Sequence, residues 1–270
     1  MIIFSRRTRS FLFVLGIVII MYGCILHDSV SYAMKFPRGV RVVASEKEMI
    51  KDMVKRMKQH PSSLSYYYPG IESDMKKYKK GHPPYVDFFD ELAKKDGYTM
   101  GTVSGYCVTI SGEEERYVTF QFGYLTTKRQ EKRITKLVKR LVKRIGHGSR
   151  LQKVKKAHDY LIEHMQYDAQ YYTPYYAFVK GKGMCMSYAL AFQRIMQEMK
   201  IPCIYVKGKE HAWNMVKVGG YWYNVDVTWD DNSYARYRYF MKTDKDFFGH
   251  KRPKSRWFRS LKKAKKSYQW

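Results

Sequence analysis

Hydrophobic residues recur at helical spacing in several stretches of this chain. Apolar residues return there every three or four positions, as they do on the buried face of an amphipathic helix. Ser45, with Glu48 three residues later, has the spacing of a capping box and marks the start of the first stretch. Gly97 is interpreted as a stop signal after the second. Helices are predicted over residues 45–59, 85–95, 134–145 and 150–165 and in the run that follows Cys185.

Alternating apolar and polar residues predict strands in two blocks. The first block, residues 103–125, alternates on both sides of a Ser-Gly-Glu turn and is expected to form a β-hairpin. The second block follows Pro202, and its last two strands are joined through Gly219-Gly220, a strong hairpin signal. Strands are predicted there at residues 203–206, 211–218 and 221–227, with a further strand at 64–68. Residues 70–84 are polar and basic and are expected to be mostly loop.

Residues 1–33 have the pattern of a targeting segment. Three arginines precede Phe11–Leu26, an uncharged apolar run of 16 residues, and Ser31 and Ala33 are small residues of the kind that signal peptidase accepts. The run is somewhat shorter than the ~20 residues of a spanning helix. We therefore expect a cleaved secretory signal, with an uncleaved membrane anchor as the alternative. The protein would then be secreted or membrane-anchored, with its catalytic domain outside the cytoplasm.

The chain is strongly basic, with 51 Lys and Arg against 24 Asp and Glu and a formal net charge of +27. Removing residues 1–33 takes away three arginines and one aspartate, which leaves +25. Such a charge favours adhesion to polyanions, and an anionic cell wall or membrane surface would suit an exported protein. No nucleic acid partner is expected, because the chain has neither zinc-finger spacing nor an RNP-like aromatic motif. The oligomeric state is not predicted.

Four cysteines occur in the sequence, of which three would remain after cleavage: Cys107, Cys185 and Cys203. An odd number of cysteines in an exported protein leaves at least one free thiol. A disulfide between Cys107 and Cys203 would leave Cys185 free, and three unpaired thiols fit the sequence equally well.

Cys185 has the sequence surroundings of a nucleophile. A turn marked by Gly181 and Gly183 runs into it, and a helical pattern begins immediately afterwards. In the first turn of a helix, exposed backbone N–H groups and the positive end of the helix dipole favour a thiolate over a thiol. The alternative is a buried structural cysteine, which is what most lone cysteines are.

His211 and Asp226 are candidates for the base and the carboxylate that a cysteine nucleophile uses. If the strands pair across Gly219-Gly220, residues whose numbers sum to 439 face each other, so His211 faces Thr228. Asp226 lies two residues earlier on the same face and is then a diagonal neighbour of His211. In a triad the histidine takes the thiol proton, and the carboxylate fixes the tautomer of the histidine. Taken singly, each residue is more readily assigned a structural role.

Four sequence blocks follow one another in the second half of the chain: GMCMSYA at 183–189, IPC at 201–203, HAWN at 211–214 and WYNVDVTWDD at 222–231. In residue type, order and spacing they resemble the bacterial transglutaminase-like superfamily. The resemblance covers residues 150–231 well, and the hairpin and basic helix at 103–145 less specifically. It implies an α+β fold in which a papain-like transglutaminase core, with the cysteine helix packed on an antiparallel sheet, follows a small α/β N-terminal region.

The resemblance also implies roles for individual residues. Cys185 would be the nucleophile, His211 the general base and acid, and Asp226 the orienting carboxylate, with the main-chain N–H of Cys185 in the oxyanion hole. Tyr175 or Tyr176 could supply a second oxyanion donor. The sequence has no calcium-loop signature, and we expect neither a metal nor another cofactor.

Several neighbouring residues are given secondary roles. Met186 departs from the small or amide residue more usual after the cysteine in this family, which points to a difference in substrate access or acceptor chemistry. Trp213 and Trp229 are expected to pack against the triad rather than touch substrate. His158 and His164 are six residues apart, which does not suit a metal pair on one helix face, so they are expected to be structural or exposed.

The expected organisation is a signal peptide or membrane anchor at 1–33, an N-terminal α/β region at 34–127, a transglutaminase-like catalytic core at 128–250 and a basic C-terminal tail at 251–270. The expected function is that of an exported cysteine peptidase or acyltransferase that acts on peptide or glutamine amide bonds of a protein or peptide substrate through a thioester. Transfer to water or to an amine is left open, and small-molecule acyl transfer is allowed by the same triad. The alternative is a non-catalytic module that binds the cell envelope and retains the fold.

Overall fold

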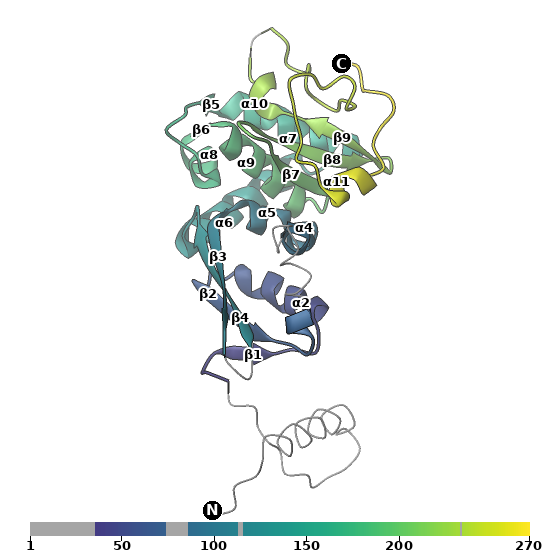
Figure 1. The fold of residues 1–270 in the computed structure, drawn as a ribbon. Coiled ribbons are helices and arrows are strands. Elements are labelled where there is room, and N and C mark those ends of the chain that lie inside the picture. The colour runs from purple at the N-terminus through teal and green to yellow at the C-terminus, as the bar shows by residue number, and fades with distance from the viewer. Residues whose placement is uncertain (1–35, 74–85, 113–115, 233) are drawn as a thin grey trace, which may run out of the picture.

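The computed structural model describes residues 36–73, 86–112, 116–232 and 234–270 of the chain. An N-terminal part is built on a four-stranded sheet, and a C-terminal part is built on a three-stranded sheet (Figure 1). The predicted α+β class is confirmed. In the described ranges, no helix combines the length and the apolar character that a membrane crossing requires. The predicted targeting segment at 1–33 and most of the predicted loop at 70–84 lie outside these ranges.

The N-terminal sheet has the strand order β1-β2-β4-β3. Its strands are β1 (Val40–Val42), β2 (Ser63–Tyr67), β3 (Val103–Ser111) and β4 (Tyr117–Tyr124). β1 runs parallel to β2, whereas β2 and β3 are both antiparallel to β4. The predicted hairpin is β3 with β4, and its pairing extends from Val103 opposite Tyr124 to Ser111 opposite Tyr117.

Helices α2 (Glu46–Met57) and α4 (Val86–Lys95) pack on this sheet through one shared core. α2 begins at the predicted cap, because the Ser45 hydroxyl accepts a 3.3 Å hydrogen bond from the N–H of Glu48. The Glu48 carboxylate in turn accepts one of 2.8 Å from the N–H of Ala44, one residue earlier than a strict capping box requires.

A short helix that the sequence pattern does not predict, α5 (Gly97–Gly101), follows α4. α4 ends at Lys95, as the stop signal at Gly97 predicts, and the carboxylate of Asp96 accepts a 3.1 Å hydrogen bond from the N–H of Thr99 and starts a new helix. α5 packs closely on the C-terminal part. A Cβ on Gly101 would lie 2.5 Å from Leu190 Cδ2, so a larger residue here would force the Leu190 side chain to shift.

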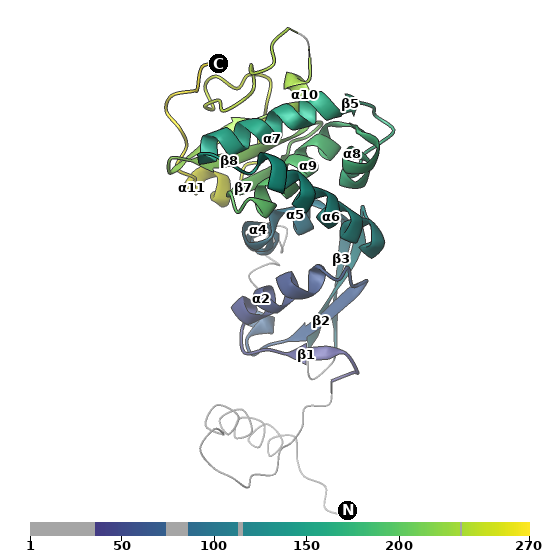
Figure 2. The same ribbon diagram turned by 180° about the vertical axis from the view of Figure 1, so that it is seen from behind.

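The C-terminal part contains four longer helical segments: α6 (Lys128–Ile145), α7 (Arg150–His164), α8 (Pro174–Lys180) and α9 (Cys185–Glu198). α6 and α7 begin with reciprocal capping boxes at Thr127 and Ser149. α9 lies between the other helices and the sheet (Figure 2), and most of its side chains are buried. A short parallel pair, β5 (Gln166–Tyr167) with β6 (Lys182–Gly183), precedes it.

The C-terminal sheet is antiparallel and has the order β7-β8-β9. Its strands are β7 (Cys203–Lys207), β8 (Ala212–Val218) and β9 (Tyr221–Val225). Helix α9 packs on β7 and β8, which is the predicted arrangement of a cysteine helix on an antiparallel sheet. The pairing of β8 with β9 has the predicted register, since Val218 lies opposite Tyr221 and Asn214 opposite Val225.

Strand β9 ends at Val225, two residues before the predicted end, because Asp226 caps the next helix, α10 (Val227–Asp230). The chain then passes through an irregular segment to α11 (Arg256–Ser260). The N–H of Ala264 donates a 2.9 Å hydrogen bond to the carbonyl of Trp222, so the basic C-terminal residues lie along β9.

Candidate active site

Cys185 is the first residue of α9, as predicted, and a tightly packed turn leads into it. A Cβ on Gly183 would lie 2.3 Å from the Cβ of Ser187, and the Ser187 hydroxyl donates a 2.8 Å hydrogen bond to the carbonyl of Tyr171. Met184 occupies the N-cap position and provides no side-chain hydrogen bond. The first-turn N–H groups of α9 are therefore not taken up by a capping side chain.

The thiol of Cys185 is buried and is hydrogen-bonded to the ring of His211. Burial by itself raises the pKa of this thiol. The hydrogen bond with His211, the N–H groups of Ala212 and Met186 and the charge of His211 outweigh burial and leave the pKa of Cys185 below its ordinary value. The surroundings of Cys185 thus favour the thiolate.

The other two cysteines of the described ranges, Cys107 and Cys203, are also free thiols. They lie on different sheets, Cys107 on β3 and Cys203 on β7, so the alternative of a disulfide between them is wrong. Burial raises the pKa of Cys203 far above its ordinary value, which makes that thiol inert. Of these three cysteines, Cys185 is the one that combines a lowered pKa with a histidine partner.

His211 directly precedes β8 and Asp226 directly follows β9, so the hairpin brings the two side chains together. His211 Nε2 lies 2.7 Å from Asp226 Oδ2, which leaves Nδ1 for Cys185. Burial by itself lowers the pKa of His211, but the hydrogen bonds with Asp226 and Cys185 and the charges of both raise it to about 9. A raised imidazole pKa beside a lowered thiol pKa favours a thiolate–imidazolium pair near neutral pH.

The carboxylate of Asp226 is buried and is contacted at both oxygens. Oδ1 accepts hydrogen bonds from the N–H groups of Thr228 (3.0 Å) and Trp229 (3.2 Å), while Oδ2 faces His211 and His250. Burial by itself raises the pKa of Asp226, but the hydrogen bonds and charges of the two histidines lower it below its ordinary value. Asp226 is therefore held as an anion.

His250 is a site residue that sequence reasoning missed. Its Nε2 lies 2.8 Å from the same Oδ2 of Asp226, and its ring centre lies 5.4 Å from that of His211. It belongs to the irregular segment between α10 and α11, where no periodic pattern aligns it with the hairpin. Its signal in the sequence is a histidine shortly after Phe247-Phe248, which does not by itself indicate a site.

Two tryptophans enclose these histidines, as predicted. The ring centre of Trp213, which is buried, lies 6.2 Å from that of His211. Trp229 is partly exposed, and its ring centre lies 5.0 Å from His211 and 4.3 Å from His250. Both therefore pack against the histidines, and Trp229 covers them on the solvent side.

Tyr175 does not fit the expectation of a second oxyanion donor. Its hydroxyl accepts a 3.2 Å hydrogen bond from Arg133 of α6, and its ring packs against the same guanidinium. Tyr176 packs edge-on against Tyr171. The N–H of Ser187 donates to the carbonyl of Met184 and the N–H of Met186 faces the thiol, so the main-chain N–H of Cys185 is the first-turn donor that the geometry supports for an oxyanion.

A second buried histidine–aspartate pair lies near the site and has a structural role. His158 Nε2 lies 3.0 Å from Asp230 Oδ2, both side chains are fully buried, and the pair joins α7 to α10. His164 is exposed, and its ring donates to the carbonyl of Tyr160. Both histidines therefore occupy the structural or exposed positions expected of them.

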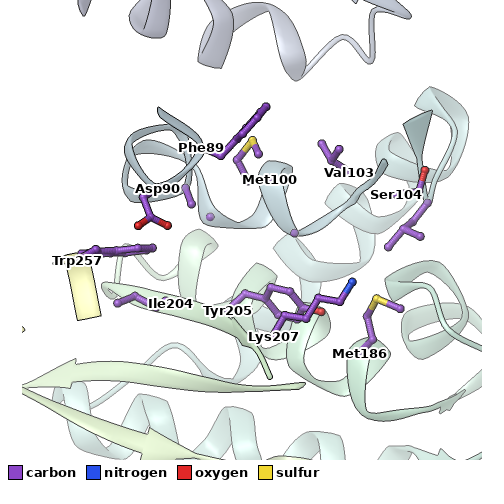
Figure 3. A pocket seen from close by; sticks show the side chains of 14 residues that line it. Phe89, Asp90, Met100, Val103, Ser104, Met186, Ile204, Tyr205, Lys207 and Trp257 are labelled. Atoms are coloured by element: carbon purple, nitrogen blue, oxygen red, sulfur yellow. The ribbon is translucent and has the colours of Figure 1, made fainter. Parts of the chain in front are cut away.

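A cavity of about 290 Å³ lies where the N-terminal and C-terminal parts meet (Figure 3). Its lining, drawn from both parts, includes Phe89, Asp90, Ala93, Met100, Val103, Met186, Ile204, Tyr205, Lys207 and Trp257. Met186 and Tyr205 also pack in the apolar cluster around Cys185. Burial, and then the charge of Cys185, raise the pKa of Tyr205. The cavity therefore shares a wall with the surroundings of Cys185.

The donor atoms of His211, Asp226 and His250 lie within 4.8 Å of one another, which is close enough to consider a metal ion. Both histidine Nε2 atoms, however, lie at hydrogen-bond distance from one carboxylate oxygen. A metal ion would sit between these atoms at ~2 Å from each and would displace the contact that orients His211. We therefore assign the three residues to a hydrogen-bonded network.

A cysteine at a helix start, paired with a histidine and an aspartate on an antiparallel sheet, defines a cysteine-enzyme fold. The family model described as transglutaminase-like superfamily matches residues 139–227, which include Cys185, His211 and Asp226. This segment of the chain is therefore similar to a transglutaminase-like core.

Two solved structures are similar at low sequence identity. A transglutaminase crystal structure is 12% identical with a TM-score of 0.35, and the match covers 70% of this chain and 58% of that one. A candidate cysteine protease from Cytophaga hutchinsonii is 14% identical with a TM-score of 0.31, and the match covers 46% of this chain and 62% of that one. This chain thus spans less than two thirds of either structure. No curated protein matches it.

Proposed function

We propose that this protein is an exported cysteine enzyme that cleaves peptide or glutamine amide bonds through a thioester on Cys185. The observation that carries the proposal is the continuous contact from Cys185 through His211 to Asp226, with the pKa of the thiol lowered and that of the imidazole raised. A structural cysteine has no need of such a partner, because burial alone keeps a thiol protonated, as it does at Cys203.

In the acylation step, the Cys185 thiolate attacks the carbonyl carbon of the amide. The oxyanion forms at the main-chain N–H of Cys185, and the His211 imidazolium gives its proton to the leaving nitrogen as the carbon–nitrogen bond breaks. The products are a thioester on Cys185, a free amine or ammonia, and a neutral His211. Asp226 keeps Nε2 of His211 protonated throughout, so Nδ1 is the nitrogen that moves the proton.

In the deacylation step, neutral His211 takes a proton from the acceptor as the acceptor attacks the thioester carbonyl. Release of the Cys185 thiolate restores the ion pair. Water as the acceptor gives peptidase or amidase activity, and a primary amine gives transglutaminase activity. We place the side chain of the acyl-donor substrate in the cavity beside Met186, because Met186 and Tyr205 line this cavity and also pack in the apolar cluster around Cys185.

Export is part of the proposal and is supported by the sequence of residues 1–33. The net charge of +27 suits adhesion to an anionic cell wall or membrane surface, where peptide substrates would be encountered. Cell fractionation with an antibody to the C-terminal part should find the protein in the envelope or the medium. Its recovery from the cytoplasm would contradict export and leave the chemistry of the site untouched.

The catalytic proposal is tested by turnover on a panel of glutamine peptides and cell-wall peptides, with and without a primary amine. We expect ammonia or amine release that is lost in Cys185→Ala, and the product of the amine-containing reaction identifies the acceptor. Retention on anionic cell wall without turnover of any peptide would favour a non-catalytic binding module instead.

A further inference from the structure

Both ring nitrogens of His250 face hydrogen-bond acceptors. Nε2 lies 2.8 Å from Asp226 Oδ2, and Nδ1 lies 2.9 Å from the carbonyl oxygen of Phe248. A carbonyl oxygen accepts only, and so does an ionised carboxylate. A neutral imidazole carries one N–H, so it would leave one of these two contacts without a proton. The doubly protonated imidazolium satisfies both.

The surroundings of His250 suit a buried cation. Its side chain is 1% exposed. The aromatic ring of Phe247 stacks on it at 3.8 Å between ring centres, and those of Trp229 and Trp213 lie at 4.3 and 4.9 Å. Aromatic rings attract a cation, although ring orientation sets how strongly. The carboxylate of Asp226 supplies the opposite charge at hydrogen-bond distance, which a buried cation requires.

We propose that His250 is a protonated positioning residue, and that His211, Asp226 and His250 form a charged His–Asp–His chain that sets the basicity of His211. The inference rests on the proposed function of the same site and adds a fourth member to it. It assigns His250 no contact with substrate, because Asp226 and His211 lie between it and Cys185.

A charged His250 changes what Asp226 does for His211. Without the positive charge of His250, the full negative charge of Asp226 would stabilise the His211 imidazolium. His211 would then hold its proton too firmly for transfer to a leaving amine. With it, the charge of Asp226 is partly balanced, and the cation also repels a proton on His211. His250 thus lowers the pKa of His211 relative to an isolated His–Asp pair and favours its role as an acid.

Three ionisable groups face His250 from the elements packed against it: Asp226, His211 and the phenol of Tyr239, whose ring centre lies at 5.5 Å. Lys251 and Arg252 follow it in the chain, and Arg252 is paired with Asp244. Asp226 is the anion at hydrogen-bond distance, so the effect on His211 must pass through this carboxylate or directly between the two rings.

The test is a titration of the His211 ring by NMR in the full-length protein, with its signal assigned by its loss in His211→Ala. His250→Gln and His250→Phe both remove the charge, and the second also keeps an aromatic ring in the enclosure. We expect the His211 midpoint to rise by about two pH units in each, the shift that a unit charge at a ring separation of 5.4 Å produces at an effective dielectric constant of about 20. An unchanged or lower midpoint in folded variants would overturn the proposal.

The matched control is His158→Gln, which removes another fully buried histidine bonded to an aspartate but has no part in the network. It should leave the His211 midpoint in place even if it lowers the stability. A second measurement needs no variant: the nitrogen chemical shifts of His250 in the wild-type protein at pH 7 should show two N–H groups. A single N–H would refute the proposal even if the variants fail to fold. Neither readout requires turnover, so this outcome is separate from that of the peptide panel.

Discussion

Replacing Asp226 with asparagine should disable the thiolate while preserving the shape of the site. The pKa of His211 is raised to about 9, about 2.5 units above its ordinary value of 6.5. At 1.36 kcal/mol per pH unit this is on the order of 3 kcal/mol in favour of the imidazolium. Burial by itself lowers this pKa, so the hydrogen bonds and charges of Asp226 and Cys185 together exceed the net shift, and the hydrogen bond of Asp226 is the largest of the raising contributions. A hydrogen bond to a charged group contributes about 1.5–3 kcal/mol, so we assign Asp226 about 2 kcal/mol, or about 30-fold. The new amide would also direct an N–H at Nε2 and favour the wrong tautomer of His211.

The assay is the rate of alkylation of Cys185 by iodoacetamide across pH 5 to 10, followed by intact mass. In Asp226→Asn we expect the alkylation rate at pH 6.5 to fall about 30-fold. The acid limb of the pH–rate profile should move toward the pKa of an ordinary thiol. Asp230→Asn is the matched control, because Asp230 is an equally buried carboxylate that bonds His158 instead. The reasoning is refuted if Asp226→Asn alkylates at the wild-type rate with an unchanged pH profile.

Three further predictions concern the pH profile, the turn and the cavity. In the wild-type protein, alkylation of Cys185 should stay fast at pH values below the ordinary thiol pKa. Peptide turnover should fall as the pH rises through about 9, because His211 then loses the proton that the leaving group needs. An alkylation profile with a single limb at an ordinary thiol pKa would contradict this. Gly183→Ala should lower the free energy of unfolding in urea by about 1–3 kcal/mol, because the new Cβ would collide with Ser187. The control is Gly105→Ala, whose Cβ would have no neighbour within 4 Å, and it should change the free energy of unfolding far less. Ala93→Phe should fill the cavity and raise KM for peptide substrates by about tenfold, while the rate of Cys185 alkylation by iodoacetamide stays unchanged. An unchanged KM would exclude the cavity as the binding site of the acyl-donor substrate.

Local pattern and hairpin register made Cys185, His211 and Asp226 candidates, and the resemblance to the transglutaminase-like superfamily gave them their roles. The Gly219-Gly220 turn fixes which residues of β8 and β9 face each other, and this register places His211 and Asp226 at the same end of the hairpin. The predicted pairing of His211 with Thr228 is not formed, because Asp226 caps α10 and Thr228 lies in that helix. The capping role of Asp226 could not be separated from a strand end, because an aspartate after an apolar run fits both. Met186 was noted for its type, but its place in a cavity wall depends on how α5 packs on β7.

His250 lay beyond sequence reasoning for a different physical reason. Its position is set by tertiary packing of an irregular segment against Trp213, Trp229 and Phe247, and no periodicity or turn chemistry encodes such a contact. The second oxyanion donor was similarly open, since the contact of Tyr175 with Arg133 joins residues that are 42 positions apart. Contacts of this kind depend on side chains from distant segments and not on the local pattern.

The most direct test of the central claim is the mass of the protein after brief incubation with glutamine peptides or cell-wall peptides and acid quenching. We predict an added acyl group that peptide mapping places on Cys185 and that hydroxylamine removes, as expected for a thioester. The adduct should be absent in Cys185→Ala and strongly reduced in His211→Ala. An unmodified Cys185 under conditions in which the same sample is rapidly alkylated by iodoacetamide would contradict the proposed amide chemistry, and an adduct on any other residue would contradict the assignment of the nucleophile.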